Sequence, residues 1–254
     1  MLPTIRYIFL TAWRDKMFWV LLAGILAAGV IAHMLGATAP DNTRELTAVY
    51  SSNAARVMII IGLIVFVCSH LQHAFETREV DVFLSRPLTR TKLILAYWVG
   101  FANVALIHAA AVVLLLGMQD VVNWKGFLLW SGSLLLECWL VVAIALFASF
   151  TLKSSVSAVL ASMGFYMLAR IMAFFVVTTQ TTFLFQQQWL NAIVVYILKG
   201  ISMIMPRLDF FAKDEWLTAG VHHAADLQLF VGQAAIFIPL LILATVADFN
   251  RKQF

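Results

Sequence analysis

The chain has 254 residues, of which 63% are hydrophobic and 12% charged, and its mean hydropathy is +0.92. Soluble domains are about half apolar and a quarter charged, so this composition excludes an ordinary soluble domain and predicts a membrane-embedded protein. The net charge of +4 forms no basic face or stripe, which argues against nucleic-acid binding. The two cysteines, Cys68 and Cys138, are too few for a disulfide scaffold.

The N-terminal segment predicts a short amphipathic helix. Pro3 suits a first helical position. Apolar residues then recur at helical spacing on one face, with Arg6 and Arg14 off that face. The apolar residues are Ile5, Ile8, Phe9, Ala12 and Trp13. We expect this helix to lie on the inner membrane surface, and a plain positively charged lead-in to the first span is the alternative.

Six apolar runs are long enough to cross a bilayer, since a helical span needs about 20 residues. They are residues 17–35, 54–73, 93–117, 127–150, 155–177 and 228–248. These runs leave no room for a folded soluble domain. We therefore predict an all-α integral membrane protein with six transmembrane helices, in which residues 1–254 form a single transmembrane domain.

The positive charges near the ends of the runs predict an orientation. If the N-terminus is cytoplasmic, ten Lys and Arg residues fall on inner segments and six, Arg56 among them, fall on outer segments. Because inner loops of membrane proteins carry an excess of Lys and Arg, both termini are expected on the cytoplasmic side. The expected location is the bacterial inner membrane.

Residues 178–227, between the fifth and sixth runs, then form a long outer segment. Part of it, 189–205, is apolar but is interrupted by Asn191, Lys199 and Gly200. We expect a re-entrant or interfacial helix there. A seventh span is the alternative, and it would move the basic C-terminal tail to the outer side.

A charged stretch, EVDVFLSRPLTRTKL, separates the second and third runs. The chain entering it contains no Gly or Pro, so the second helix is expected to continue. Val80, Phe83 and Leu84 follow i, i+3, i+4 spacing and give an apolar stripe opposite Glu79 and Asp81. The sequence therefore predicts a short amphipathic helix at the inner membrane surface.

This predicted helix is followed by a turn and a basic collar. Pro87 ends the helix, and Thr89 or Thr91 can cap the third span. Arg90 and Lys92 mark the inner end of that span. Such a helix and turn suit docking into a groove of a cytosolic partner, and a charged loop solvated among the lipid headgroups is the alternative.

The segment FETREVDVFLSRPLTRTKLILAYWVG resembles the loop between spans two and three of ABC-2 type permeases. In this chain the positions that match the family pattern are Glu76, Asp81, Phe83, Leu84, Ser85, Pro87, Leu88, Thr89 and Arg90. Two features differ from the pattern. Arg78 and Glu79 replace a Gly-Thr pair that many members carry, and Ala96 and Tyr97 replace a Gly-Lys pair after the collar.

The resemblance implies that this loop contains a coupling helix, which seats against a cytosolic ATP-binding subunit. The residues it assigns to docking are Glu76, Asp81, Phe83, Leu84, Ser85, Arg86, Pro87 and Arg90. It also implies a second permease subunit, identical or paralogous, and export as the usual direction. The chain has no Gly-x-x-x-x-Gly-Lys-Ser/Thr loop, so it is not expected to be an ATPase, and ATP and Mg would bind the partner subunit. The sequence does not identify a substrate.

Three polar residues lie inside the predicted spans, where charge is costly and marks function by default. His108, Glu137 and Arg170 fall at similar depth in the outer half of the membrane. We expect a Glu137–Arg170 pair with His108 nearby. The pair either holds the helices together or lines a polar pathway.

Small residues open the fifth run at i, i+4 and i+8, which are Ser154, Ala158 and Ser162. Such a stripe permits close helix packing in lipid, against a neighbouring span or a second permease subunit. His70 and His73 share a face of the second run, but two ligands make a weak metal site, and none is predicted.

Three other functions compete with a transporter subunit of the ABC type. The chain could pass ATP-driven motion to an extracytoplasmic assembly or maturation machine. It could be a membrane anchor or assembly factor that moves nothing. It could also be an ion-coupled carrier that uses His108, Glu137 and Arg170, although the inverted repeats typical of such carriers are not evident.

Overall fold

The computed structural model describes residues 2–37, 43–79, 89–118, 123–181, 205–213, 215–218, 220 and 225–251, with the isolated positions 193, 196 and 200. Every regular element in these ranges is helical. The elements are α1 (Leu2–Arg14), α2 (Lys16–Ala37), α3 (Thr43–Glu76), α5 (Arg90–Gly117), α6 (Trp124–Thr151), α7 (Ser155–Thr181), the 3-10 helix η1 (Leu208–Phe211), α9 (Glu215–Thr218) and α10 (Ala225–Arg251). The prediction of an all-α protein is confirmed for this part of the chain.

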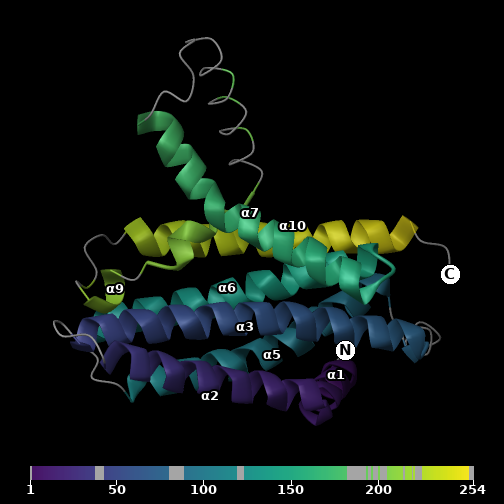
Figure 1. Cartoon of the computed structure of the whole chain (residues 1–254). Coiled ribbons are helices and arrows are strands. Elements are labelled where there is room, and N and C mark those ends of the chain that lie inside the picture. The colour runs from purple at the N-terminus through teal and green to yellow at the C-terminus, as the bar shows by residue number, and fades with distance from the viewer. Residues whose placement is uncertain are drawn as a thin grey trace.

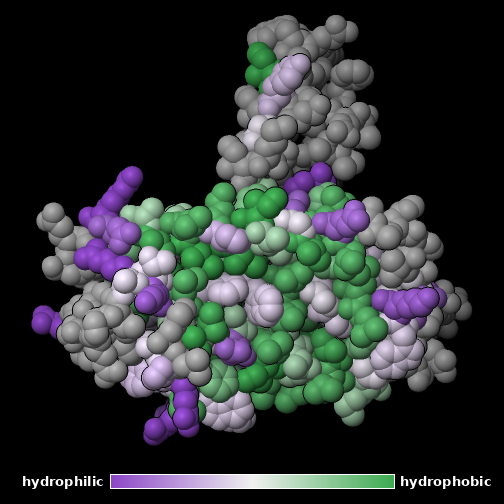
Figure 2. Space-filling view, turned by 180° about the vertical axis from the view of Figure 1, so that it is seen from behind, coloured by the Kyte–Doolittle hydropathy of each residue, from purple (hydrophilic) through white to green (hydrophobic). Residues whose placement is uncertain are grey.

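Five of these helices are long and apolar enough to cross a membrane: α2, α3, α5, α6 and α10. Figure 2 shows the matching surface, with a broad hydrophobic band across the middle and hydrophilic side chains gathered toward the two ends. The protein is therefore of the multi-pass membrane type. The sixth predicted span, 155–177, falls within α7, whose described apolar part is Ser155–Ile171, so the six-span arrangement stays a prediction.

The long helices lie side by side, and α7 crosses them before its C-terminal half leaves the bundle (Figure 1). One end of the bundle carries α1, the end of α3, the start of α5 and the end of α10, and we name it the α1 end. The other carries α9 and the starts of α3 and α6, and we name it the α9 end.

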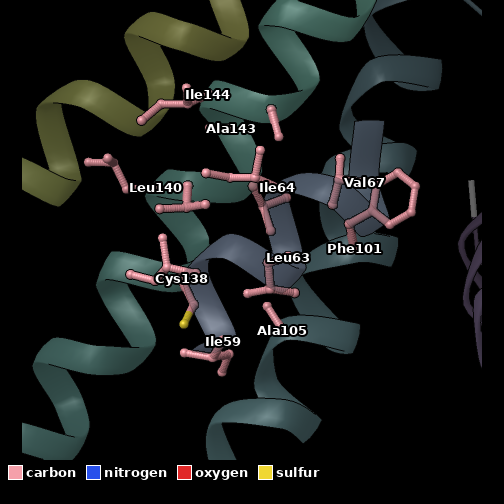
Figure 3. Packing of buried hydrophobic residues seen from close by; sticks show 14 of the residues in the cluster. Ile59, Leu63, Ile64, Val67, Phe101, Ala105, Cys138, Leu140, Ala143 and Ile144 are labelled. Carbon is pink, nitrogen blue, oxygen red and sulfur yellow. The ribbon is translucent and has the colours of Figure 1, made fainter. Parts of the chain in front are cut away.

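Helix α3 is at the centre of the packing. Its residues Ile59, Leu63 and Val67 follow i, i+4, i+8 spacing, and all three are fully buried. Figure 3 shows these side chains between α5 and α6, facing Phe101 on one side and Cys138 on the other. Helix α3 also begins eleven residues before the predicted span at position 54, because the polar segment that precedes the apolar run is helical too.

The N-terminal amphipathic helix is confirmed as α1, and its apolar face packs on α5. Ile8 and Ala12 are buried, and a Cβ at Gly100 of α5 would lie 2.7 Å from Ile8 Cγ2, so the two helices approach closely there. Asp15 separates α1 from α2. Its carboxylate accepts a hydrogen bond from the amide of Met17 (3.0 Å) and lies 3.3 Å from His70 Nδ1 of α3.

Two short helices between α7 and α10, η1 and α9, pack on the bundle. Leu208 and Phe211 of η1 and Trp216 of α9 are buried. Helix α9 packs against the first turn of α6, where a Cβ at Gly126 would lie 1.7 Å from Trp216 O. Only glycine fits this backbone approach. Residues 205–213 and 215–218 of the predicted outer segment therefore belong to the structured part of the chain, whereas most of the predicted re-entrant helix 189–205 lies outside the described residues.

Candidate functional site

A buried carboxylate joins three helices near the middle of the bundle. Glu137 of α6 is fully buried and forms an ion pair with Arg56 of α3. Its other carboxylate oxygen accepts hydrogen bonds from Tyr166 Oη (2.9 Å) and Arg170 Nη1 (3.2 Å), both on α7. One carboxylate thereby holds α3, α6 and α7 together.

Arg56 is buried in the bundle, and its side chain is 2% exposed. Besides the ion pair with Glu137, it donates to Phe211 O of η1 (3.0 Å) and Ser133 Oγ of α6 (3.4 Å). Its guanidinium also lies 4.7 Å from the ring centroid of Trp130. The carboxylate, carbonyl, hydroxyl and ring together compensate the loss of hydration of this charge.

Arg170 is the more open of the two arginines, with a side chain that is 28% exposed. It shares the carboxylate of Glu137 and donates to Leu208 O of η1 (3.2 Å). The backbone carbonyls of η1 thus accept hydrogen bonds from both arginines. We name Arg56, Glu137, Tyr166 and Arg170 the buried ion-pair network, and it fixes η1 against the bundle.

The network lies deep between the ends of the long helices. Glu137 follows the start of α6 by 13 residues and precedes its end by 14, which places it about 20 Å from either end. With both arginines and the carboxylate ionised, these three groups carry a net charge of +1. Charge at this depth is costly unless it is paired and hydrogen-bonded, which explains the number of partners.

The structure brings together Glu137 and Arg170 but corrects the third member of the predicted cluster. His108 is buried elsewhere. Its Nδ1 lies 2.9 Å from Val104 O of α5, and its Nε2 lies 3.2 Å from Phe18 O of α2. Its ring also contacts the Phe18 ring edge-on, with centroids 4.5 Å apart. His108 therefore bridges α2 and α5, because its face of α5 packs on α2.

Arg56 and Tyr166 are the members that the sequence reasoning missed. The sequence pattern places Arg56 on an outer segment, at the edge of the second run, and this prediction is wrong because its side chain is buried in the bundle. Helical spacing offered a signal, since Arg56 shares a face with the buried Ile59 and Leu63 at i+3 and i+7. Without Arg56 the outer segments hold five positive charges against ten, so the charge bias that predicts orientation becomes stronger.

Two of the three small residues predicted to form a packing face on α7 are buried in the bundle. Ala158 and Ser162 are fully buried, and Ser162 Oγ lies 3.9 Å from Cys68 Sγ of α3. Ser154 precedes the helix and is exposed. The four-residue spacing continues through Tyr166 and Arg170, so the same stripe leads from the close helix contact into the ion-pair network.

Two of the eight docking residues lie within the described part of the chain. Glu76 is the exposed last residue of α3. Arg90 is the first residue of α5, and its N-cap is Thr89, one of the two candidates that the sequence offers. The other six, which lie outside the described residues, are Asp81, Phe83, Leu84, Ser85, Arg86 and Pro87.

Arg90 binds the end of another helix. Its Nη1 donates to Phe249 O (2.8 Å) and Asn250 O (3.4 Å) of α10, and its guanidinium lies 5.4 Å from the Phe249 ring centroid. The last carbonyls of a helix lack intrahelical partners and carry partial negative charge, so a cation is stabilised there. The start of α5 is thereby attached to the C-terminal turn of α10.

A scan against protein-family models and a search of curated proteins find no match for this chain. The family resemblance therefore depends on the residues of the loop between α3 and α5 and on the helical layout.

Proposed function

We propose that this chain is the transmembrane subunit of an ATP-driven transporter of the ABC-2 type, working as an exporter. ATP would be hydrolysed by a separate cytosolic subunit, and a second permease subunit would complete the assembly. The observation that carries the proposal is the charged loop motif of residues 76–90, which connects two helices that are each long enough to cross a membrane. In this proposal the α1 end faces the cytosol of a bacterial cell.

The contacts around the loop support a route for motion. The loop begins at Glu76, directly after α3, and ends at Arg90, which binds the C-terminal turn of α10. A partner that moves the loop would therefore act on α3, α5 and α10 together. Buried contacts pass this motion on as discrete shifts, because packed helices resist continuous deformation.

The buried ion-pair network supports a mechanical role in this proposal. It links α3, α6 and α7 through one carboxylate, and it holds η1 through the carbonyls of Leu208 and Phe211. A shift of α3 would then be transmitted to α7 and to η1.

The docking residues are tested by co-purification from mild detergent with mass spectrometry. We expect an ATP-binding subunit to accompany the wild-type chain and to be lost from the Phe83→Asp, Leu84→Asp double variant, because the two carboxylates remove the apolar stripe. Met118→Asp is the matched control, since Met118 is 86% exposed at the other end of α5. Absence of any ATP-binding protein from the wild-type preparation, or its retention by the double variant, contradicts the proposal.

An ion-coupled carrier is the second candidate, and the buried carboxylate favours it. Intramembrane carboxylates paired with arginine are used in ion and proton pathways. Vesicles that contain the purified chain alone discriminate the two functions. Transport driven by an ion gradient without ATP would support the carrier, whereas transport that requires ATP and the partner subunit supports the exporter. A third outcome, ATP-dependent assembly of an outer protein complex without transport, would support the machine-driving alternative.

A further inference from the structure

An open apolar groove of about 540 Å³ runs between α6 and α10 at the α9 end. Its walls are formed by one stripe on each helix, including Leu128, Gly132 and Leu136 from α6 and Leu227 and Val231 from α10. Leu128, Leu227 and Val231 are substantially exposed. Because both helices are candidate spans, this face lies against lipid hydrocarbon when the chain is in a bilayer.

The groove exists because a side chain is missing from its wall. A Cβ at Gly132 would meet nothing within 4 Å. Leu128 before it is exposed, Leu136 after it is partly exposed, and both line the groove with Gly132 between them. Apart from Lys125 the lining of the groove is apolar, so an acyl chain fills it better than water does.

The α6 wall of the groove corresponds in length to one leaflet, whereas the α10 wall, Leu227 to Val231, is about one helical turn long. Lys125, which lines its mouth, and Leu136 are eleven residues apart on α6, which is about 16 Å along the helix axis. Half of the hydrocarbon core of a bilayer is about 15 Å. An acyl chain that begins at Lys125 would therefore reach the region of the bilayer centre at Leu136.

The mouth has the chemistry of a headgroup site. Lys125 is exposed in the first turn of α6, next to Trp124, which is also exposed. Lysine and tryptophan at the end of a span are typical of the membrane–water interface. A lysine is a strongly hydrated point charge that binds phosphate well.

We propose that this groove binds one phospholipid, with an acyl chain along Gly132 and the phosphate on Lys125. A cationic mouth that continues along an apolar α6 wall one leaflet long is complementary to such a molecule. This site is separate from the loop motif and from the buried ion-pair network, so it does not depend on the proposed transport function.

The test uses the delipidated full chain in mild detergent, to which dioleoylphosphatidylglycerol is added before native mass spectrometry. Gly132→Leu fills the groove, and Gly164→Leu on α7 is the matched control, since a Cβ there also meets nothing within 4 Å. We expect the wild-type chain and the control to retain one more phospholipid than Gly132→Leu. Equal retention by all three chains overturns the proposal.

Lys125→Gln tests the headgroup contact without changing the groove. We expect about fivefold weaker binding of phosphatidylglycerol, and unchanged binding of dioleoylglycerol, which has no phosphate. An unchanged affinity for phosphatidylglycerol overturns the role of Lys125. The same spectra report the oligomeric state. If Gly132→Leu converts a dimer to a monomer with no change in lipid count, the groove is a contact between two copies, and the proposal is wrong.

Discussion

Replacing Glu137 by glutamine is expected to destabilise the folded bundle by about 3–5 kcal/mol, which is the usual cost of removing one partner of a buried ion pair. The side chain keeps its size but loses its charge. Arg56, at 2% exposure, then remains buried without a counter-charge, and Arg170 loses the same partner. Ser133 Oγ and Phe211 O still accept hydrogen bonds from Arg56, but neither is charged.

The measurement is thermal unfolding of the purified chain in one detergent at fixed lipid content. For a chain of this size, each kcal/mol corresponds to about 2–4 °C in Tm, so a decrease of about 6–20 °C is expected. Arg170→Gln is the comparison variant. Its side chain is partly exposed, and Glu137 keeps Arg56, so we expect a loss of about 1 kcal/mol or less.

A double variant separates the cost of an unpaired charge from the cost of poor packing. Arg56→Met with Glu137→Leu removes both charges and keeps apolar volume, so it is expected to be more stable than Glu137→Gln. If Glu137→Gln melts within about 2 °C of the wild-type chain, the network does not hold the helices together and the reasoning is refuted.

Three further predictions concern other parts of the fold. Gly126→Ala is expected to destabilise the fold by about 1–3 kcal/mol, because its Cβ would overlap Trp216 O and displace α9 from α6. The measurement is a lower Tm, and an unchanged Tm would show that α9 does not pack there. Arg90→Ala is expected to release the C-terminal turn of α10, at a cost of about 1–2 kcal/mol, and to speed amide hydrogen exchange there relative to the start of α10. The orientation is tested by cysteine labelling in a chain without its native cysteines. Met118→Cys is expected to react with an impermeant thiol reagent in intact spheroplasts, whereas Glu76→Cys is expected to react only after lysis. The reverse pattern would contradict the proposed orientation.

The helices themselves could be predicted from the sequence. Apolar runs of about 20 residues in a chain with few charges leave helical spans as the only way to satisfy the backbone, so 93–117 and 127–150 match α5 and α6 to within three residues at each end. The N-cap of α5 could be narrowed to Thr89 or Thr91, because the helix must begin after the turn that Pro87 imposes, and the structure shows that it is Thr89.

The partners of buried polar side chains could be predicted only in part. Glu137 and Arg170 have opposite charges and a similar predicted depth in the membrane. These two properties were enough to predict that they form a pair. His108 has the same depth, yet it faces α2, because which face of α5 meets which neighbour depends on the rotation of each helix in the bundle. Depth along a helix is a local property, whereas the direction of a side chain is set by packing.

What the sequence alone determined is the class of protein, the course of its long helices and the position of its charged loop, since length, hydropathy and the conformational limits of proline act locally. Only the tertiary structure decided that Arg56 belongs to the core. A positive charge at the edge of an apolar run can be stabilised in two ways, by water at the membrane surface or by a buried counter-charge. Both environments are compatible with the sequence pattern. The choice depends on Glu137, 81 residues away, and on the backbone of η1, 155 residues away, which come together only when the bundle closes.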